Sequence, residues 1–427
     1  MDPPPGARGR AGGASRARIS CRVVYPEDSS VADGVLTVGG CDARDLAREF
    51  GTPAYVVAED DLRAGARAFV GALAAAHEGP GEVVFASKAF PCTAVLRVFA
   101  EEGLGCDVAS GGELHLALRA GFAPDRLYLH GNAKSEAELR MALEAGVGTV
   151  VLDNEHEAAR LAALGGGPRV LLRVVPGVDA DTHEHILTGQ AGSKFGMTPD
   201  VARALAERVD VAGLHMHIGS QLRSLDPYRR AVAALARVGD FEVYDLGGGL
   251  AVRYLERDDV PSPEEWVRHM VAAAHAELGA GKSLVLEPGR SLVANAGVTL
   301  YRVESVKPGV GGERIVAVDG GMSDNLRPML YGAAYEAAVA DRMGAGGDVC
   351  TVVGKHCESG DVLVRDVRLP DPRPGDVLVT PVTGAYGHAM ANNYNGVPRP
   401  PVIFCSDGDA RVVVRRETYE DLSGRDV

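Results

Sequence analysis

Short apolar runs alternate with longer amphipathic stretches from about residue 53 to residue 290. The runs are rich in β-branched residues, whereas the stretches between them carry apolar residues at helical spacing and close on glycine. Eight runs occur: EVVFASK (82–88), GCDVAS (105–110), RLYLHGN (126–132), TVVLDN (149–154), RVLLRVVP (169–176), VAGLHMHIGS (211–220), FEVYDLGGG (241–249) and SLVLEPGR (283–290). Eight strand–helix units predict an α/β fold, a closed (β/α)8 TIM-type barrel over residues 51–311, with PAYVVAED (53–60) leading into a preceding helix. A doubly wound open sheet is the alternative that the same alternation allows.

After about residue 310 the pattern changes to strand-like runs without helices between them, such as RIVAVDGG, DVCTVVG, DVLVRDVRLP and GDVLVTPV. Turn signals such as RPGD and SDGD separate these runs, which predicts a mainly antiparallel β domain, sandwich-like or barrel-like, over residues 312–427. The segment GVLTVGG (34–40) is expected to add a strand, so residues 19–50 join this domain. Residues 1–18 are rich in Pro, Gly and Arg, and we expect a disordered tail there.

Composition and charge narrow the class of protein. The chain has 427 residues, 46% of them hydrophobic and 24% charged, which is enough for two domains with ordinary cores. A formal charge of -14 argues against nucleic acid or an anionic membrane as the main partner and favours a small-molecule role. No run of eighteen apolar residues and no secretory signal is found in the sequence. The seven cysteines form no CxxC pair and no metal-ligand cluster, which indicates reduced thiols in the cytoplasm.

One lysine raises a question about chemistry. Lys88 ends a strand that reads as buried, and it is one of only six lysines in the chain. It either extends into solvent beyond the strand end or serves a site. In a barrel the active site lies at the carboxyl ends of the strands. Those ends hold many polar residues: Lys88, Asp107, Ser110, His130, Asn132, Arg173, His217, Ser220, Asp245, Glu287 and Arg290.

A glycine run follows Asp245, and by itself it is either a phosphate cradle or a plain tight turn. A strand-end lysine, a glycine loop and a strand-end glutamate together indicate pyridoxal 5′-phosphate. In this interpretation Lys88 would hold the aldehyde covalently, the glycines would hold the phosphate, and Glu287 would keep the pyridine nitrogen protonated. His217 could stack on the ring, or it could be a hydrogen-bonded core histidine.

Several motifs carry a resemblance to a known family. They are FASKAF, CDVASGGEL, LHGNAKSEAEL, PGVDADTHEHILTG with KFG, HMHIGSQ, DLGGGL, EPGRSLV, VDGGMSDNLRPMLYGA, GKHCESGD and TGAYGHAMANNYN. From about residue 35 to 424 the chain resembles the diaminopimelate decarboxylases, which belong to the alanine-racemase-like class of pyridoxal-phosphate enzymes. CESGD together with DNLRPMLYG is far more discriminating than the glycine loop.

The resemblance implies a role for individual residues. Lys88 would carry the cofactor, His217 would stack on its ring, Glu287 would face its pyridine nitrogen, and Cys357 would donate a proton to the carbon that loses CO2. Glu358 would bind the distal amino group of the substrate. Phosphate and other cofactor contacts are implied for Asp107, Ser220, Gly248, Gly249, Gly289, Arg290 and Tyr386. The CESGD segment would reach the site of the neighbouring subunit, so Cys357 and Glu358 would complete the partner's site in a homodimer.

The substrate can also be argued from charge. Meso-2,6-diaminopimelate carries a second carboxylate, which calls for guanidinium partners, and its decarboxylation gives L-lysine. Arg290 and Arg327, with Tyr331 one helical turn further, suit that task, and Tyr386 is expected to share in substrate binding. Surface salt bridges are the ordinary alternative for such arginines. An ornithine, lysine or carrier-bound amino acid decarboxylase of the same fold stays open, because GGGLAVRY and GHAMANN depart locally from the family pattern.

Overall fold

The computed structural model describes residues 23–178 and 193–427. The expected tail 1–18 and most of the PGVDADTHEHILTG motif lie outside these residues. Eight parallel strands close into a barrel in the order β10-β11-β12-β5-β6-β7-β8-β9, so the predicted barrel is confirmed. The strands are β5 (Gly81–Ala86), β6 (Gly105–Val108), β7 (Leu127–Leu129), β8 (Thr149–Leu152), β9 (Arg169–Arg173), β10 (Gly213–His215), β11 (Val243–Asp245) and β12 (Ser283–Leu286).

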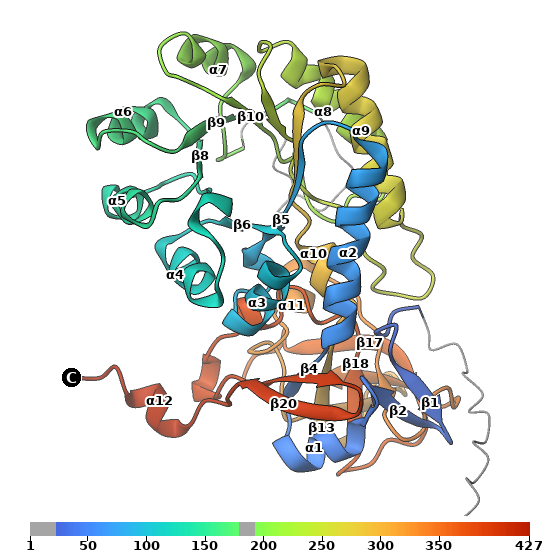
Figure 1. The fold of residues 1–427 in the computed structure, drawn as a ribbon. Coiled ribbons are helices and arrows are strands. Elements are labelled where there is room, and N and C mark those ends of the chain that lie inside the picture. The colour runs from blue at the N-terminus through green and yellow to red at the C-terminus, as the bar shows by residue number, and fades with distance from the viewer. Residues whose placement is uncertain (1–22, 179–192) are drawn as a thin grey trace, which may run out of the picture.

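Helices surround the barrel (Figure 1). They are α3 (Thr93–Glu101), α4 (Gly111–Ala120), α5 (Glu136–Ala145), α6 (Glu155–Ala163), α7 (Pro199–Ala206), α8 (Asp226–Ala236), α9 (Pro263–Leu278) and α2 (Glu59–Ala76). The helix after β12, α10 (Arg290–Val293), has only four residues. Helix α2 precedes the first barrel strand and packs between α9 and α3. It therefore takes the place in the ring that the helix after β12 would occupy.

Local sequence signals set where the ring helices begin and end. Ser135 accepts a hydrogen bond from the backbone of Glu138, whose side chain binds back to Ser135, and this capping box starts α5. Ser262 and Glu265 form the same arrangement at α9. Helix α5 ends at Gly146, which adopts the left-handed conformation that glycine allows at low cost. These caps set where the helices begin and therefore where the connections that follow the barrel strands end.

A second domain holds a nine-stranded, mainly antiparallel sheet, as the sequence predicts. Its main path runs β17-β16-β14-β13-β4-β19-β20, and β15 and β18 pair beside it. The strands are β4 (Ala54–Ala58), β13 (Gly297–Pro308), β14 (Arg314–Val318), β15 (Ala338–Val339), β16 (Asp348–Val353), β17 (Val362–Leu369), β18 (Val377–Thr380), β19 (Val402–Ser406) and β20 (Asp409–Val414). Short helices α1 (Ala43–Phe50), α11 (Arg327–Tyr331) and α12 (Tyr419–Ser423) complete the chain, and no helix in the described ranges is long and apolar enough to cross a membrane.

Two differences from the expected organisation concern strand partners. Strands β4 and β13 fall inside the expected barrel limits of 51–311, yet they pair with each other in the second sheet. The expected strand in GVLTVGG (34–40) forms as β2 (Val35–Val38), but it lies in a separate three-stranded antiparallel sheet with β1 (Ser30–Ala32) and β3 (Cys41–Asp42). An apolar pattern reveals a buried strand but not its partner. The chain thus enters and leaves the barrel through two neighbouring strands of the second sheet (Figure 1).

Candidate active site

The carboxyl ends of the barrel strands bring most of the predicted polar residues together. Strand β5 ends at Ala86, and Lys88 follows in the turn η1 (Ser87–Ala89), with its own side chain exposed between two buried neighbours. Desolvation lowers the pKa of Lys88, but the electrostatic effects of Asp107 at the end of β6, Tyr386 and Glu287 together outweigh it and raise that pKa. Lys88 thus lies within electrostatic reach of Asp107 and of Glu287, which follows β12, at the carboxyl end of the barrel.

Glu287 is the most constrained side chain at this rim. Its Oε1 lies 2.8 Å from Nε2 of His130, which follows β7, and its Oε2 lies 3.1 Å from Nε2 of His215 at the end of β10. Burial alone would raise the pKa of Glu287, but the two imidazoles reverse this and hold the pKa well below its usual value. Burial, followed by the repulsion of Glu287, raises the pKa of Asp245 well above its ordinary value. The cluster thus keeps an ionised carboxylate at Glu287 and a protonated one at Asp245.

The glycine loop after β11 packs directly on neighbouring strand ends. A Cβ at Gly248 would lie 2.1 Å from the carbonyl oxygen of Glu287, and one at Gly249 would lie 2.4 Å from that of Gly219. Gly249 also has φ of 109°, a region that side chains strongly disfavour. The backbone N–H of Gly248 donates to Nδ1 of His217 over 3.3 Å, which orients that ring. Burial, Lys88 and Arg173 keep the pKa of His217 well below its usual value, so the imidazole is neutral.

Arg290, the first residue of α10, contacts two predicted residues, Ser220 and Tyr386, and one that the sequence did not indicate, Tyr254. Its Nη2 donates to Oγ of Ser220 over 2.9 Å, and its Nη1 donates to the Tyr254 hydroxyl over 2.6 Å. Its guanidinium carbon lies 4.7 Å from the ring centre of Tyr386. The backbone N–H of Tyr386 donates to the carbonyl of Ala89, beside Lys88, over 2.9 Å. Ser220, Arg290 and Tyr386 are therefore neighbours of the lysine turn, and Gly289 packs on that turn as well, since a Cβ there would lie 2.9 Å from Cβ of Ala86.

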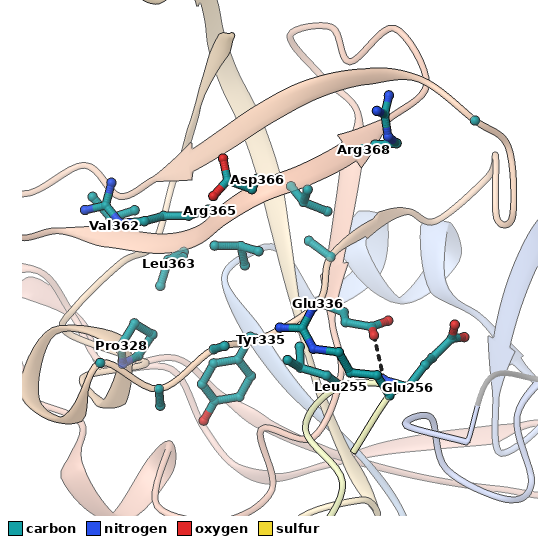
Figure 2. A pocket seen from close by; sticks show the side chains of 18 of the residues that line it. Leu255, Glu256, Pro328, Tyr335, Glu336, Val362, Leu363, Arg365, Asp366 and Arg368 are labelled. Carbon is teal, nitrogen blue, oxygen red and sulfur yellow. Dashed lines mark hydrogen bonds between the residues drawn. The ribbon is translucent and has the colours of Figure 1, made fainter. Parts of the chain in front are cut away.

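Arg327 and Arg290 both contact the ring of Tyr254. The guanidinium carbon of Arg327 is 4.3 Å from the ring centre of Tyr254, and its Nη1 donates to the Tyr335 hydroxyl. Arg327 is only 5% exposed and Arg290 only 6%. The hydrogen bond from Arg327 goes to Tyr335, which the sequence did not indicate, and the substrate contact expected for Tyr331 stays a prediction. Tyr335 also lines a cavity between α11, the segment after it and β17, whose volume is about 830 Å³. Figure 2 shows the side chains around this cavity.

Cys357 and Glu358 lie in the turn between β16 and β17 of the second domain. Cys357 is exposed, and its backbone N–H donates to Oδ1 of Asn395 over 2.9 Å. The preceding His356 is buried, with Nδ1 2.7 Å from Oδ2 of Asp361. An Oε1 of Glu358 accepts from the backbone of Gly360. In the described part of the chain these hydrogen bonds stay within the second domain, and none of them reaches Lys88.

The sequence did not single out His215, Tyr254 and Tyr335. A signal for His215 was present, because His215 and His217 alternate in HMH and therefore face the same side of an extended segment. Tyr254 lies in the long connection from β11 to α9, and Tyr335 follows α11. Neither position has a periodic pattern that would reveal its neighbours.

The residues at this rim fit pyridoxal phosphate. An exposed lysine amine suits an aldehyde. Gly248 and Gly249 pack too closely on their neighbours to carry a side chain, so no side chain of these two residues covers their backbone N–H groups. The buried Glu287 offers an ionised carboxylate to a pyridine nitrogen. Lys88 would hold the cofactor, and the glycine loop with Ser220 would face its phosphate.

Comparison with known proteins agrees with this geometry. The family described as "Pyridoxal-dependent decarboxylase, pyridoxal binding domain" matches residues 60–294. The chain is 48% identical to a diaminopimelate decarboxylase of Actinosynnema pretiosum subsp. auranticum over 95% of each chain. It is 44% identical to the Bacillus subtilis enzyme of that name over 91% of this chain and 94% of the relative.

Solved structures extend the match to the whole fold. A diaminopimelate decarboxylase from M. jannaschii aligns with a TM-score of 0.87 and 31% identity over 94% of this chain and 98% of that one. The Helicobacter pylori enzyme, solved with L-lysine, aligns with a TM-score of 0.83 and 30% identity over 89% and 98%. The chain is thus a pyridoxal-phosphate-dependent carboxy-lyase, and it belongs to the diaminopimelate decarboxylase family.

Proposed function

We propose that this site removes CO2 from one end of meso-2,6-diaminopimelate and releases L-lysine, the last step of lysine biosynthesis. When bound, pyridoxal phosphate supplies an electron-accepting ring for the charge that CO2 leaves on carbon. Lys88 attaches the cofactor through its amine, and His217 presents a neutral imidazole face to the ring. Glu287 keeps a proton at the pyridine nitrogen. The buried, ionised state of Glu287 supports that role.

The observation that carries the substrate assignment is the pair of buried guanidiniums. Arg290 and Arg327 are both nearly inaccessible, both contact Tyr254, and neither forms an ion pair with a carboxylate in the described chain. A buried charge without a counter-ion is costly, which supports an anionic group of the substrate as the missing partner. Diaminopimelate has a second carboxylate for such a site, whereas ornithine and lysine have none. Tyr386 stacks against Arg290, and Tyr331 ends the short helix that begins at Arg327; these two tyrosines complete the proposed substrate contacts.

We propose further that the active unit is a homodimer in which Cys357 and Glu358 complete the partner's site. Cys357 would protonate the carbon after CO2 leaves, and Glu358 would bind the distal ammonium group. Two exposed apolar side chains lie beside this turn: Tyr394 contacts His356, and Met329 lies 3.4 Å from the position of a Cβ at Gly360. An apolar surface around a polar, reactive turn supports a protein interface there.

The six cysteines that the structure describes are all free thiols. Free thiols are typical of a reducing compartment, which supports the cytoplasmic location expected from the sequence.

The function is tested by measuring CO2 release with meso-diaminopimelate, L-lysine, D-lysine and L-ornithine side by side. We expect turnover of diaminopimelate alone. Faster release from ornithine or lysine would overturn the substrate assignment in favour of a same-fold decarboxylase. Borohydride reduction followed by digestion should place the cofactor on the peptide that contains Lys88, and a label elsewhere would contradict that attachment.

The shared site is tested by mixing two impaired variants, Lys88→Ala and Cys357→Ala. A mixed dimer would hold one complete site, formed by Lys88 of one subunit and Cys357 of the other. Random reassembly should therefore restore roughly a quarter of the wild-type activity. If Lys88 and Cys357 of the same chain formed the site, mixing would restore nothing.

A further inference from the structure

Four buried side chains surround one point of the barrel interior. His130, His215, Asp245 and Glu287 are each at most 5% exposed, and one ligand-type atom from each lies within 4.8 Å of those of the others. The two imidazoles meet edge to face with ring centres 4.8 Å apart. Each presents its Nε2 to a different oxygen of Glu287, at 2.8 Å and 3.1 Å. Glu287 is therefore held from two sides by two different strands.

This arrangement fixes both the position and the charge of Glu287. Nε2 of His215 forms a hydrogen bond with Glu287, so this nitrogen carries the proton. Nε2 of His130 lies 2.8 Å from the other oxygen without the alignment of a hydrogen bond, and it attracts the carboxylate when it carries a proton. Burial lowers the pKa of His215 to about 3, so its ring is neutral and acts as a hydrogen-bond donor. Asp245 keeps its own proton. Within this cluster the negative charge therefore resides on Glu287.

We infer that His130 and His215 are positioning residues for Glu287, which keep its carboxylate ionised and aimed so that the proton shared with the cofactor stays on the pyridine nitrogen. This inference rests on the proposed role of Glu287. Each carboxylate oxygen that accepts one hydrogen bond has a further lone pair, so the two histidines leave room for the ring nitrogen. By stabilising the anion, the donors make Glu287 a weaker base than it would be in an apolar pocket.

Other charged groups face Glu287 from the remaining strands, and they affect how strongly its carboxylate holds a proton. Lys88 after β5 and Arg173 at the end of β9 favour the anion, while Asp107 on β6 opposes it. The neutral His217 stands beyond β10. His130 and His215 bring a side-chain nitrogen to 2.8 Å and 3.1 Å from the Glu287 oxygens, and the protonated Asp245 adds a further interaction with that carboxylate.

The same four residues could instead hold a divalent transition metal, because two imidazoles and two carboxylates are common ligands. The two interpretations differ in what Glu287 contacts. A metal would occupy the carboxylate oxygens that our inference assigns to the histidines and the cofactor. Metal analysis of the cofactor-loaded enzyme therefore separates them, and one bound ion per chain would overturn the inference.

The direct test uses pyridoxal phosphate labelled with 15N, whose ring-nitrogen chemical shift reports its protonation in the assembled enzyme. Wild type and His215→Gln, which keeps a donor near the position of Nε2, should hold the nitrogen protonated between about pH 6 and pH 9. His215→Leu and His130→Leu remove one donor each. They should let the nitrogen titrate within that range and weaken cofactor binding roughly tenfold or more.

Controls distinguish positioning from a general loss of structure. His77→Leu removes another buried histidine, one that contacts His275 and the Lys282 carbonyl between α2 and α9, and it should leave the 15N signal unchanged. If His215→Leu does not fold, His130→Leu provides the same test. An unchanged nitrogen in both leucine variants would overturn the inference. Glu287→Gln tests the role of Glu287 separately from that of the histidines, because an unaffected ring nitrogen in this variant would mean that Glu287 lacks its proposed role.

Discussion

Replacing Arg327 by alanine should impair recognition of diaminopimelate without disturbing the chemistry at the other end of the substrate. Arg327 is buried, and its guanidinium is held over Tyr254 and against Tyr335, so its orientation is set before any substrate arrives. A buried carboxylate that loses such a partner costs about 3–5 kcal/mol, because the remaining charge stays desolvated. At about 1.4 kcal/mol per tenfold, kcat/KM should fall by roughly 10²-fold to a few thousandfold. Most of the loss should appear in KM, since the distal contact is made in ground and transition states alike.

The assay is steady-state CO2 release with meso-diaminopimelate, combined with the visible absorption of the bound cofactor. Arg327→Lys keeps the charge but loses the planar fork, and it should recover part of the affinity. Arg368→Ala is the matched control, because Arg368 is an exposed arginine at the cavity of Figure 2 and should behave as wild type. A KM for diaminopimelate that stays within twofold of wild type in Arg327→Ala would refute the reasoning and favour a substrate without a second carboxylate.

Three further outcomes are expected. Cys357→Ala should slow turnover at least tenfold while the protein keeps its yellow cofactor, and full activity would exclude a proton-donor role. Gly248→Ala places a Cβ 2.1 Å from the Glu287 carbonyl, so thermal unfolding and cofactor binding should both show a loss of stability, whereas Gly281→Ala, which meets open space, should not. Burial raises the pKa of Asp324 to about 7, so the folded state binds an extra proton between about pH 4 and 7 and the free energy of unfolding should fall as pH rises through that window. Urea unfolding should show this slope, at most about 1.4 kcal/mol per pH unit from this group, and Asp324→Asn should remove it.

The number and order of the barrel strands could be predicted because each strand has a recognisable local sequence pattern. A buried parallel strand needs a continuous apolar run, and its helix needs a cap and an amphipathic face, so each unit is visible in one stretch of sequence. The membership of β4 and β13 could not be predicted in the same way. Both carry the same apolar pattern as barrel strands, and only pairing between residues more than two hundred positions apart assigns them to the second sheet.

Candidate site residues at strand ends could be predicted from the sequence, whereas those on long connections could not. Lys88, Asp107, Glu287 and the glycine loop were identifiable because a barrel places every strand end on one rim, so position along the chain implies position in space. Tyr254 and Tyr335 were not, because they lie on long connections whose course depends on packing. The motif around Cys357 was evident in the sequence. Its position relative to Lys88 was not, because Cys357 lies in a turn of the second domain.

The sequence alone determined the repeated strand–helix units, the polar rim at their carboxyl ends and the pairing of an amine with a glycine loop and a glutamate. These features depend on residues close together in the chain or on a regular fold that converts spacing into place. Only the tertiary structure decided that Glu287 lies between His130 and His215 and that Arg290 and Arg327 meet at Tyr254. The physical reason is that hydrogen bonds and desolvation act over a few ångströms in space, and the residues concerned lie far apart along the chain.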